Sequence, residues 1–389
     1  MTQAEVIVIG GGLIGCATAY YLARGGARVA LLERGELNRE ASGQNAGSLH
    51  FQLEFRMIVE GEAIAEQFAL SLPLCLEAQQ RWATLEEELG EPVGLHLAGG
   101  LMVAETADEI AALRQKSALE NRNGLETSIL DGDEARAIAP YLSPTVQAAC
   151  WCPTEGHASP RLVGPAFAAA AARLGASIRP RTEVTGLAPV GSGWRVALRN
   201  GEQLDAGSVV VAAGVWSGQV TAMAGMPLPL VGHPLTIFAT APAPPLVDHL
   251  VQHAGQRLSL KQTSEGNVLV GGGWPSRLLG AAGDDLSRRP ALVLGSITGS
   301  AAIAARVVPA VASLSAIRIW TGVAGVTPDN VPLLGELAGL PGLFVATGGA
   351  GFTLGPTLAQ LTADLVLEGA TAFPLETFSP ARVVGAARS

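Results

Sequence analysis

Two glycine-rich segments near opposite ends of the chain have the residue types and spacing that can hold a dinucleotide. The first is a GxGxxG pattern formed by Gly10, Gly12 and Gly15. Its first glycine allows a tight turn, the second lets the backbone approach a pyrophosphate, and the third lets the next helix pack closely on a strand. Backbone N–H groups at the start of that helix, including those of Leu13 and Ile14, are predicted to bind the pyrophosphate.

An acidic residue follows where such a site needs one. Glu33 ends the next apolar run, and its carboxylate can accept hydrogen bonds from a ribose hydroxyl; its neighbour Arg34 belongs to the predicted site. A carboxylate would repel the 2′-phosphate of NADP, so the pattern predicts FAD or NAD. This unit alone leaves the choice between the two cofactors open.

The second segment is the run Gly-Gly-Ala-Gly-Phe-Thr-Leu-Gly-Pro at 348–356, which follows a short apolar strand and is predicted to open a helix. A helix N-terminus combines unpaired N–H groups with the positive end of the helix dipole. We therefore predict that Gly349, Gly351, Phe352 and Thr353 face an anionic or electron-rich group.

Other segments have small residues that a cofactor could approach. Ala41 to His50 is a polar, glycine-bearing loop. The strand that begins at Ser208 ends in Ala212-Ala213-Gly214, which leaves space for a cofactor against the backbone. The remaining predicted cofactor contacts are Val184, Trp216 and Gly322.

Alternating strands and helices must position these residues. Val6–Ile9 is expected as a buried strand, Leu13–Arg24 as a helix and Ala27–Glu33 as a second strand, which makes a βαβ unit of about thirty residues. From Met226 to about Ile319, strands alternate with turns in a half-alternating pattern that indicates an antiparallel sheet with one packed face.

The fold class is therefore α/β, with a Rossmann-like domain on a parallel sheet and a second, α+β domain on a mainly antiparallel sheet. A chain of 389 residues also suggests two domains of about 100–200 residues each. The predicted nucleotide-binding domain is discontinuous, and the substrate domain is inserted into it. The former comprises 1–50, 150–225 and 322–389, and the latter 51–149 and 226–321.

Composition and charge exclude several functions. The net charge is −9 with no run of Lys or Arg, so no nucleic-acid-binding surface is expected. The four cysteines show no zinc or iron–sulfur spacing, so no metal is expected and a reducing compartment is the simple interpretation. Neither a signal peptide nor a transmembrane segment is predicted, which makes the cytoplasm the expected location.

The order of these motifs resembles the D-amino-acid oxidase superfamily of flavoproteins over essentially the whole chain. Besides the GxGxxG unit, the similarity rests on the Ser/Asn/Gly loop, the Val-Val-Ala-Ala-Gly strand, the segment Trp320 to Gly335 and the Gly-Phe-Thr-Leu-Gly-Pro run. Within the superfamily, the chain resembles the branch that contains glycine oxidase and the β-subunits of sarcosine oxidase. It is especially similar to β-subunits of heteromeric dehydrogenases acting on D-hydroxyproline or opines.

This resemblance implies an enzyme in which FAD accepts hydride at flavin N5 from the Cα–H of a small amino or imino acid. The substrate would be of the D-proline or D-hydroxyproline, sarcosine or glycine, or opine type. The flavin would be reoxidised either by oxygen, as in an oxidase, or by a second subunit that serves as electron acceptor in a hetero-oligomer, as in a dehydrogenase. Relatives with covalent flavin use a Cys in the segment matching 322–327; none occurs here, so non-covalent FAD is expected.

By similarity, Ser42, Gln44 and Asn45, with Ala46 and Gly47, would lie near the isoalloxazine. The alternative is a turn whose polar side chains bond their own backbone. The N–H groups of 349–353 would face the flavin N1–C2=O edge, where reduction places negative charge.

Recognition of the substrate carboxylate departs from the family pattern. Relatives carry an Arg after the Trp-x-Gly-x motif, whereas Ala324 stands at that position here. Arg56, Lys261 and Arg318 are therefore the candidate anchors, and the alternative for each is an ordinary surface or packing role. His50 could accept the ammonium proton, unless it is a structural residue.

Two other functions remain open from the sequence. One is an NAD-dependent dehydrogenase, which the second glycine-rich helix start argues against. The other is a non-catalytic electron-transfer or assembly subunit that contains flavin.

Overall fold

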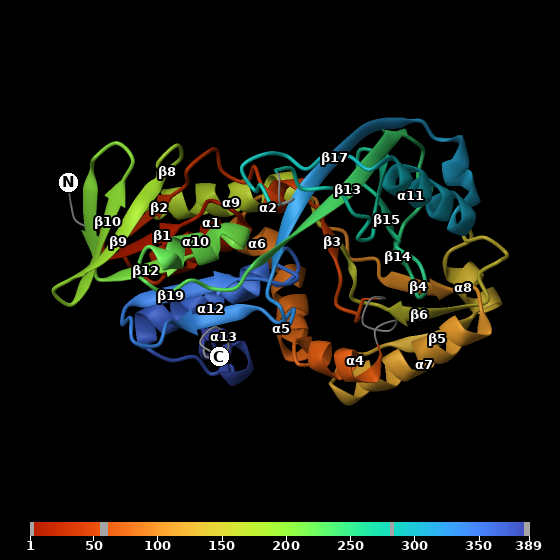
Figure 1. Cartoon of the computed structure of the whole chain (residues 1–389). Coiled ribbons are helices and arrows are strands. Elements are labelled where there is room, and N and C mark those ends of the chain that lie inside the picture. The colour runs from red at the N-terminus through yellow and green to blue at the C-terminus, as the bar shows by residue number, and fades with distance from the viewer. Residues whose placement is uncertain (1–3, 55–60, 281–283, 385–389) are drawn as a thin grey trace.

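The computed structural model describes residues 4–54, 61–280 and 284–384. The molecule is elongated and contains two large sheets, one toward each end (Figure 1).

The first sheet has six strands in the order β18-β19-β12-β1-β2-β8, and all neighbouring pairs are parallel except β18 with β19. All four residues of β1 are buried because both faces of the sheet are covered. The strands are β1 (Val6–Ile9), β2 (Val29–Leu32), β8 (Ser177–Arg179), β12 (Ser208–Val211), β18 (Leu333–Glu336) and β19 (Leu343–Thr347).

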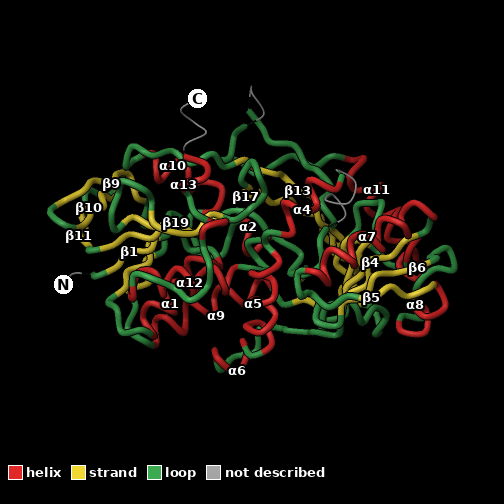
Figure 2. The backbone as a smooth tube through the Cα atoms, turned by 90° about the horizontal axis from the view of Figure 1, so that it is seen from below, coloured by secondary structure: helices red, strands yellow, loops and turns green. Residues whose placement is uncertain are grey.

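Helices cover one face of this sheet, and a small sheet covers the other (Figure 2). Val6 and Val8 pack among α1, α9 and α12, whereas Ile7 and Ile9 pack with Trp194 of the three-stranded antiparallel sheet β11-β10-β9. The bounds are α1 (Leu13–Arg24), α9 (Pro160–Arg173), α12 (Gly355–Glu368), β9 (Val184–Val190), β10 (Gly193–Leu198) and β11 (Gln203–Ala206).

The second sheet has eight strands in the order β17-β13-β16-β15-β14-β4-β6-β5 and is antiparallel except for the pair β14 and β4. Its strands are β4 (Gly100–Ala104), β5 (Ser128–Asp131), β6 (Ala148–Cys152), β13 (Val231–Pro242), β14 (Leu250–His253), β15 (Ser259–Gln262), β16 (Asn267–Gly271) and β17 (Ala316–Val326). Together the two sheets confirm the predicted α/β fold class with one parallel and one mainly antiparallel sheet.

Helices also cover the second sheet. On one face, Ile303 of α11 packs against Leu260 and Val270, while on the other Leu113 of α7 packs against Met102 and Cys150. The helices of this region are α4 (Glu62–Ala69), α7 (Ala107–Arg122), α8 (Gly132–Ile138) and α11 (Leu294–Val307). By contrast, α5 (Leu72–Ala83) and α6 (Leu85–Leu89) pack in the core of the first sheet, with α12 and α9. The remaining elements are α2 (Ala41–Gln44), β3 (Ser48–Leu49), β7 (Gly156–His157), η1 (Gly214–Trp216), α10 (Ser217–Ala222), η2 (Pro309–Ser313), η3 (Glu376–Phe378) and α13 (Ala381–Val384).

Three boundaries differ from the sequence expectations. The sequence predicts a strand from Ala316 to Thr321, but β17 runs on to Val326 because Gly322 and Gly325 continue its pairing with β13. It also predicts a helix from Ala291 to Ala305, but α11 begins only at Leu294, since Ala291 instead bridges to Arg277. The second glycine run is a loop, and α12 begins only at Gly355.

The chain passes repeatedly between the two sheets. Strands β1, β2, β8, β12, β18 and β19 fall within the segments predicted for the nucleotide-binding domain. However, β6 begins before the predicted boundary at 150, and β17 crosses the one at 322. The division into two domains stays a prediction.

Candidate active site

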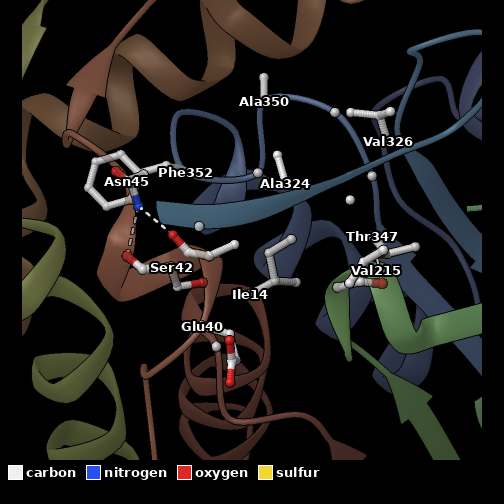
Figure 3. Close-up of a pocket in the computed structure, with 18 of the residues that line it drawn as sticks. Ile14, Glu40, Ser42, Asn45, Val215, Ala324, Val326, Thr347, Ala350 and Phe352 are labelled. Atoms are coloured by element: carbon white, nitrogen blue, oxygen red, sulfur yellow. Dashed lines mark hydrogen bonds between the residues drawn. The ribbon is translucent and has the colours of Figure 1, made fainter. Parts of the chain in front are cut away.

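A cavity of about 530 Å³ reaches both glycine-rich segments and the polar face of the eight-stranded sheet. Figure 3 shows Ile14 of α1, Ser42 of α2, Ala324 of β17 and Phe352 of the C-terminal loop around it. Segments far apart in the sequence therefore share one cavity.

The start of α1 forms a backbone cradle at one end of this cavity. A Cβ on Gly10 would lie 2.4 Å from the carbonyl oxygen of Ala212, and one on Gly15 would lie 1.8 Å from that of Gly10. Gly10 also has a φ of +115°, which favours glycine. Gly10, Gly12 and Ile14 line the cavity, whereas Leu13 and Gly15 are not among its lining residues. The tight turn and close packing that a dinucleotide site needs are thus present.

Glu33 holds the backbone around this cradle. Its carboxylate accepts hydrogen bonds from the N–H groups of Gly11 and Gly35, each at 2.7 Å, and the residue lines the cavity. Each carboxylate oxygen has a further lone pair, so Glu33 can also accept from a ribose hydroxyl as predicted. The Arg34 guanidinium lies 4.0 Å from the ring centroid of Trp216, and both residues line the same end.

The sequence left open whether the polar side chains of the loop 41–47 contact the cofactor site or bond their own backbone, and different residues of the loop do one or the other. The Ser42 hydroxyl accepts a hydrogen bond from the Leu13 N–H at 2.9 Å, which places it at the start of α1. By contrast, the Asn45 amide bonds the carbonyls of Ala41 and Ser42 and the N–H of Gly47. Asn45 therefore stabilises its own turn (Figure 3).

Gln44 likewise bonds local backbone, donating to the carbonyl of Arg39 at 2.5 Å. Its own carbonyl accepts from the Trp320 indole at 2.7 Å, which ties the loop to β17. The predicted cofactor residues Ala46, Gly47, Val184, Ala213, Gly214 and Gly322 also line the cavity.

The C-terminal glycine loop meets the start of α1. Gly349, Gly351, Phe352 and Thr353 all line the cavity. A Cβ on Gly351 would lie 3.8 Å from the Ile14 side chain, so the two segments are in direct proximity. The Thr353 carbonyl accepts from the indole of Trp82 at 2.7 Å, which fixes the loop from behind. The two glycine-rich segments thus converge on one cavity, as expected.

The four candidates for substrate chemistry have different surroundings. His50 lines the cavity, and its Nε2 lies 3.3 Å from the Ser259 hydroxyl. Arg318 is exposed and not among the lining residues; its guanidinium lies 5.8 Å from the ring centroid of Trp320. Arg56 lies outside the described residues.

Lys261 is buried beside the cavity rather than in its wall. A Cβ on Gly47, which lines the cavity, would lie 3.1 Å from the Lys261 Nζ, so this amine lies close to the loop 41–47. Within the described ranges Nζ has no hydrogen-bond partner, and burial lowers the pKa of Lys261 well below its ordinary value. Lys261 and Arg318 are thus not among the lining residues, and their roles as anchors stay predictions.

A buried polar network next to His50 was missed by sequence reasoning. It consists of Lys116 and Glu120 of α7, Gln52, Glu155 and Gln252, each at most 4% exposed. Gln52 and Gln252 line the cavity. These residues lie far apart in the sequence and match no local motif, so only the tertiary fold reveals them.

Cys150 and Cys152 are interpreted from the sequence as buried structural thiols rather than a redox-active pair, and the surroundings of the cysteines fit this interpretation. All four are buried and free, and burial raises the pKa of Cys16, Cys75 and Cys152 to about 12. In the parts of the chain that the structure describes, no group of three or more His, Cys, Asp or Glu side chains could hold a metal ion. Over the same parts, no helix is long and apolar enough to cross a membrane.

Comparison with known proteins identifies the family. Residues 5–365 match the family described as DAO, FAD dependent oxidoreductase, and the chain belongs to it. Glycine oxidase from Geobacillus kaustophilus (strain HTA426) is 30% identical over 391 residues, which cover 98% of this chain and 97% of the relative. An opine oxidase subunit from Agrobacterium tumefaciens (strain Ach5) is 28% identical over 396 residues, covering 98% of each.

Solved structures show the same fold. The crystal structure of glycine oxidase from Geobacillus kaustophilus matches with a TM-score of 0.85 and 28% identity, covering 98% of this chain and 99% of that one. That of L-proline dehydrogenase from P. horikoshii matches with a TM-score of 0.84 and 25% identity, covering 98% and 97%.

The protein is thus an FAD-dependent oxidoreductase, and its cofactor is FAD rather than the NAD that the GxGxxG unit left open. The glycine-rich cradle and the converging loop, whose glycines leave backbone open to the cavity, fit such a dinucleotide.

Proposed function

We propose that the protein oxidises the bond between carbon and hydrogen beside the nitrogen of a small amino or imino acid. D-Proline, D-hydroxyproline, sarcosine, glycine and opines are the candidate substrates. The observation that carries this proposal is the single cavity that joins the cradle of α1, the loop 349–353 and the polar side chains around His50. Similarity along the full chain to a glycine oxidase and to an opine oxidase subunit supports it.

The bound FAD would supply the electron acceptor for this oxidation. The start of α1 would bind the pyrophosphate, and Glu33 the ribose. Gly349, Gly351, Phe352 and Thr353 would turn their N–H groups toward the flavin ring and stabilise negative charge there. With no cysteine at 322–327, this FAD would be held non-covalently.

His50 would hold the proton that leaves the substrate ammonium. It lines the cavity, and the Ser259 hydroxyl beside its Nε2 can orient the ring. Oxidation requires the amine to be neutral, and an imidazole can accept a proton near neutral pH. Arg56 stays the predicted carboxylate anchor among the three cations named from the sequence.

An anaerobic flavin-reduction screen tests this function. The purified flavoprotein is mixed without oxygen with each candidate amino or imino acid, and the flavin absorbance is followed. Bleaching by at least one of them is expected, and His50→Asn should slow it with a shifted pH profile. Retention of full absorbance with every amine would contradict the proposal.

The second candidate is a protein whose flavin transfers electrons or stabilises an assembly without oxidising amines. The similarity to an opine oxidase subunit favours a role in a hetero-oligomer. We propose that a partner subunit reoxidises the flavin. Bleaching by dithionite but by no amine would favour the non-catalytic role. The cytoplasmic location stays a prediction.

A further inference from the structure

A directional chain of hydrogen bonds runs beneath the cavity from Lys116 to Gln252. Its members come from α7, the segment after β3, the turn before β7, and β14. The chain of hydrogen bonds ends at a side chain that lines the cavity. Which atom donates and which accepts in each bond can be derived by starting from Lys116.

The direction is set by the Lys116 ammonium, which can only donate. Burial would lower the pKa of Lys116, but the Glu120 carboxylate 2.7 Å away outweighs this effect, and the pKa is raised. Lys116 Nζ also donates to Gln52 Oε1 at 2.8 Å. The Gln52 amide is thereby oriented, and its Nε2 must point the other way.

Glu155 links the orientation of the Gln52 amide to that of the Gln252 amide. Its Oε1 accepts from the backbone N–H groups of Phe51 and Gln52, at 2.8 and 2.9 Å. Its Oε2 accepts from Gln52 Nε2 at 2.8 Å and from Gln252 Nε2 at 3.2 Å. A carboxylate can only accept, so Gln252 must present its Nε2 to Glu155.

The surroundings of Glu155 are shaped to hold it. A Cβ on Gly100 would lie 2.0 Å from Glu155 Oε2, so only glycine leaves room for the carboxylate there. Glu155 is fully buried, and the four hydrogen bonds that it accepts satisfy both of its oxygens.

We propose that Gln252 Oε1, the free end of this amide, faces the cavity and accepts a hydrogen bond from the substrate nitrogen. Gln252 lines the cavity and pairs across the sheet with Ser259, whose hydroxyl contacts His50. A fixed acceptor recognises nitrogen that carries hydrogen. Resting on the proposed function, this gives the candidate primary and secondary amines a contact that a nitrogen without hydrogen cannot make, while Lys116 and Glu155 act as positioning residues.

In the variant Glu155→Gln, the Gln252 side chain should present a hydrogen-bond donor to the cavity in place of its acceptor. Its carbonyl oxygen must stay at the position of Oε1, because two backbone N–H groups point there. Its NH₂ group then replaces Oε2 and faces Gln52 and Gln252. Gln52 cannot turn, because Lys116 holds its oxygen, so its NH₂ loses the hydrogen bond to the side chain at position 155. Gln252 can turn, accept from the new NH₂ with its Oε1 and present its own NH₂ to the cavity.

Binding of three five-membered rings tests this without turnover. Pyrrolidine, which is protonated at neutral pH, then carries two N–H groups. N,N-dimethylpyrrolidinium has the same positive charge without any N–H, and tetrahydrofuran offers only an acceptor. We expect the wild-type holoenzyme to bind pyrrolidine about tenfold more tightly than N,N-dimethylpyrrolidinium, by calorimetry or flavin spectral shift. Gln252→Leu should abolish this preference, and Glu155→Gln should weaken pyrrolidine and strengthen tetrahydrofuran.

The affinities of the wild type for pyrrolidine and N,N-dimethylpyrrolidinium test the proposal even if a variant fails to fold. Equal affinity of the wild type for the two cations, or no binding of pyrrolidine, would overturn the proposal, as would a folded Gln252→Leu that keeps the preference. Flavin reduction by an amino acid with no such preference would refute this inference alone. The expected preference without reduction by any amine would refute the proposed function alone.

Discussion

At the end of the cavity beside β1 and α1, the start of α1 presents backbone, whereas beside β14 and β15 the lining includes side chains held by a buried network. The first end depends on the absence of side chains: Gly10 and Gly15 leave no room for a Cβ. The second depends on polar atoms whose partners come from Lys116 and Glu155, distant in sequence. A backbone cradle suits a cofactor shared by a family, while side chains can differ with the substrate.

The largest effect should come from filling the cradle. In Gly15→Ala the new Cβ would lie 1.8 Å from the Gly10 carbonyl oxygen, so β1 and α1 must separate. We expect loss of bound FAD and a free energy of unfolding lower by about 3 kcal/mol. Flavin absorbance per protein and urea unfolding measure both. Gly295→Ala, where a Cβ meets nothing within 4 Å, is the control and should retain FAD; a fully loaded, equally stable Gly15→Ala would show that the cradle is not tight.

At the other end, the corresponding test is to remove the charge that orients the network. Lys116→Met leaves the Glu120 carboxylate buried without its ammonium, so we expect a loss of about 3–5 kcal/mol in the free energy of unfolding. The double variant Lys116→Met/Glu120→Gln removes both charges and should recover much of this loss. If the single and double variants unfold at the same urea concentration, the ion pair does not control the stability of this end.

These two ends also explain what the sequence could predict. Gly10, Gly12, Glu33 and the segment 349–353 were found because a local pattern carries their role, and the fold class followed from buried strands in the same way. Gln252 could not be predicted from a local pattern. The orientation of its amide depends on hydrogen bonds that begin at Lys116 and form only in the folded protein. Ser42 shows the intermediate case, since its loop was recognised but its bond to the start of α1 was not.

Replacing Lys261 should have a smaller effect, a pH-dependent change in the free energy of unfolding. Burial lowers its pKa in the folded protein well below 10.5, so the unfolded chain binds a proton that the folded one lacks between the two pKa values. Stability should therefore rise with pH across this window, by about 1.4 kcal/mol per pH unit from this group. Lys261→Met should be more stable than the wild type near neutral pH. This gain should disappear as pH approaches 10.5 in urea unfolding series; a gain independent of pH would mean that Lys261 is charged when folded.

Arg318 should give the smallest effect. It is exposed and does not line the cavity, so Arg318→Ala should change neither the rate of flavin reduction nor the substrate concentration at half-maximal rate by more than about twofold. Stopped-flow measurements over a substrate series provide this comparison. A large rise in that concentration would show that the side chain reaches the substrate after all.

The order of strands in the parallel sheet has a consequence for synthesis on the ribosome. Strand β1 is made first, but its neighbour β12 spans Ser208–Val211, and β19 and α12 follow only from Leu343 onward. The nascent N-terminal segment thus carries an apolar strand and a cofactor motif with only β2 beside β1, long before β12, β19 and α12 are made. Capture of FAD must wait for almost the entire chain, so a truncation before Leu343 should emerge without cofactor and depend on chaperones to stay in solution.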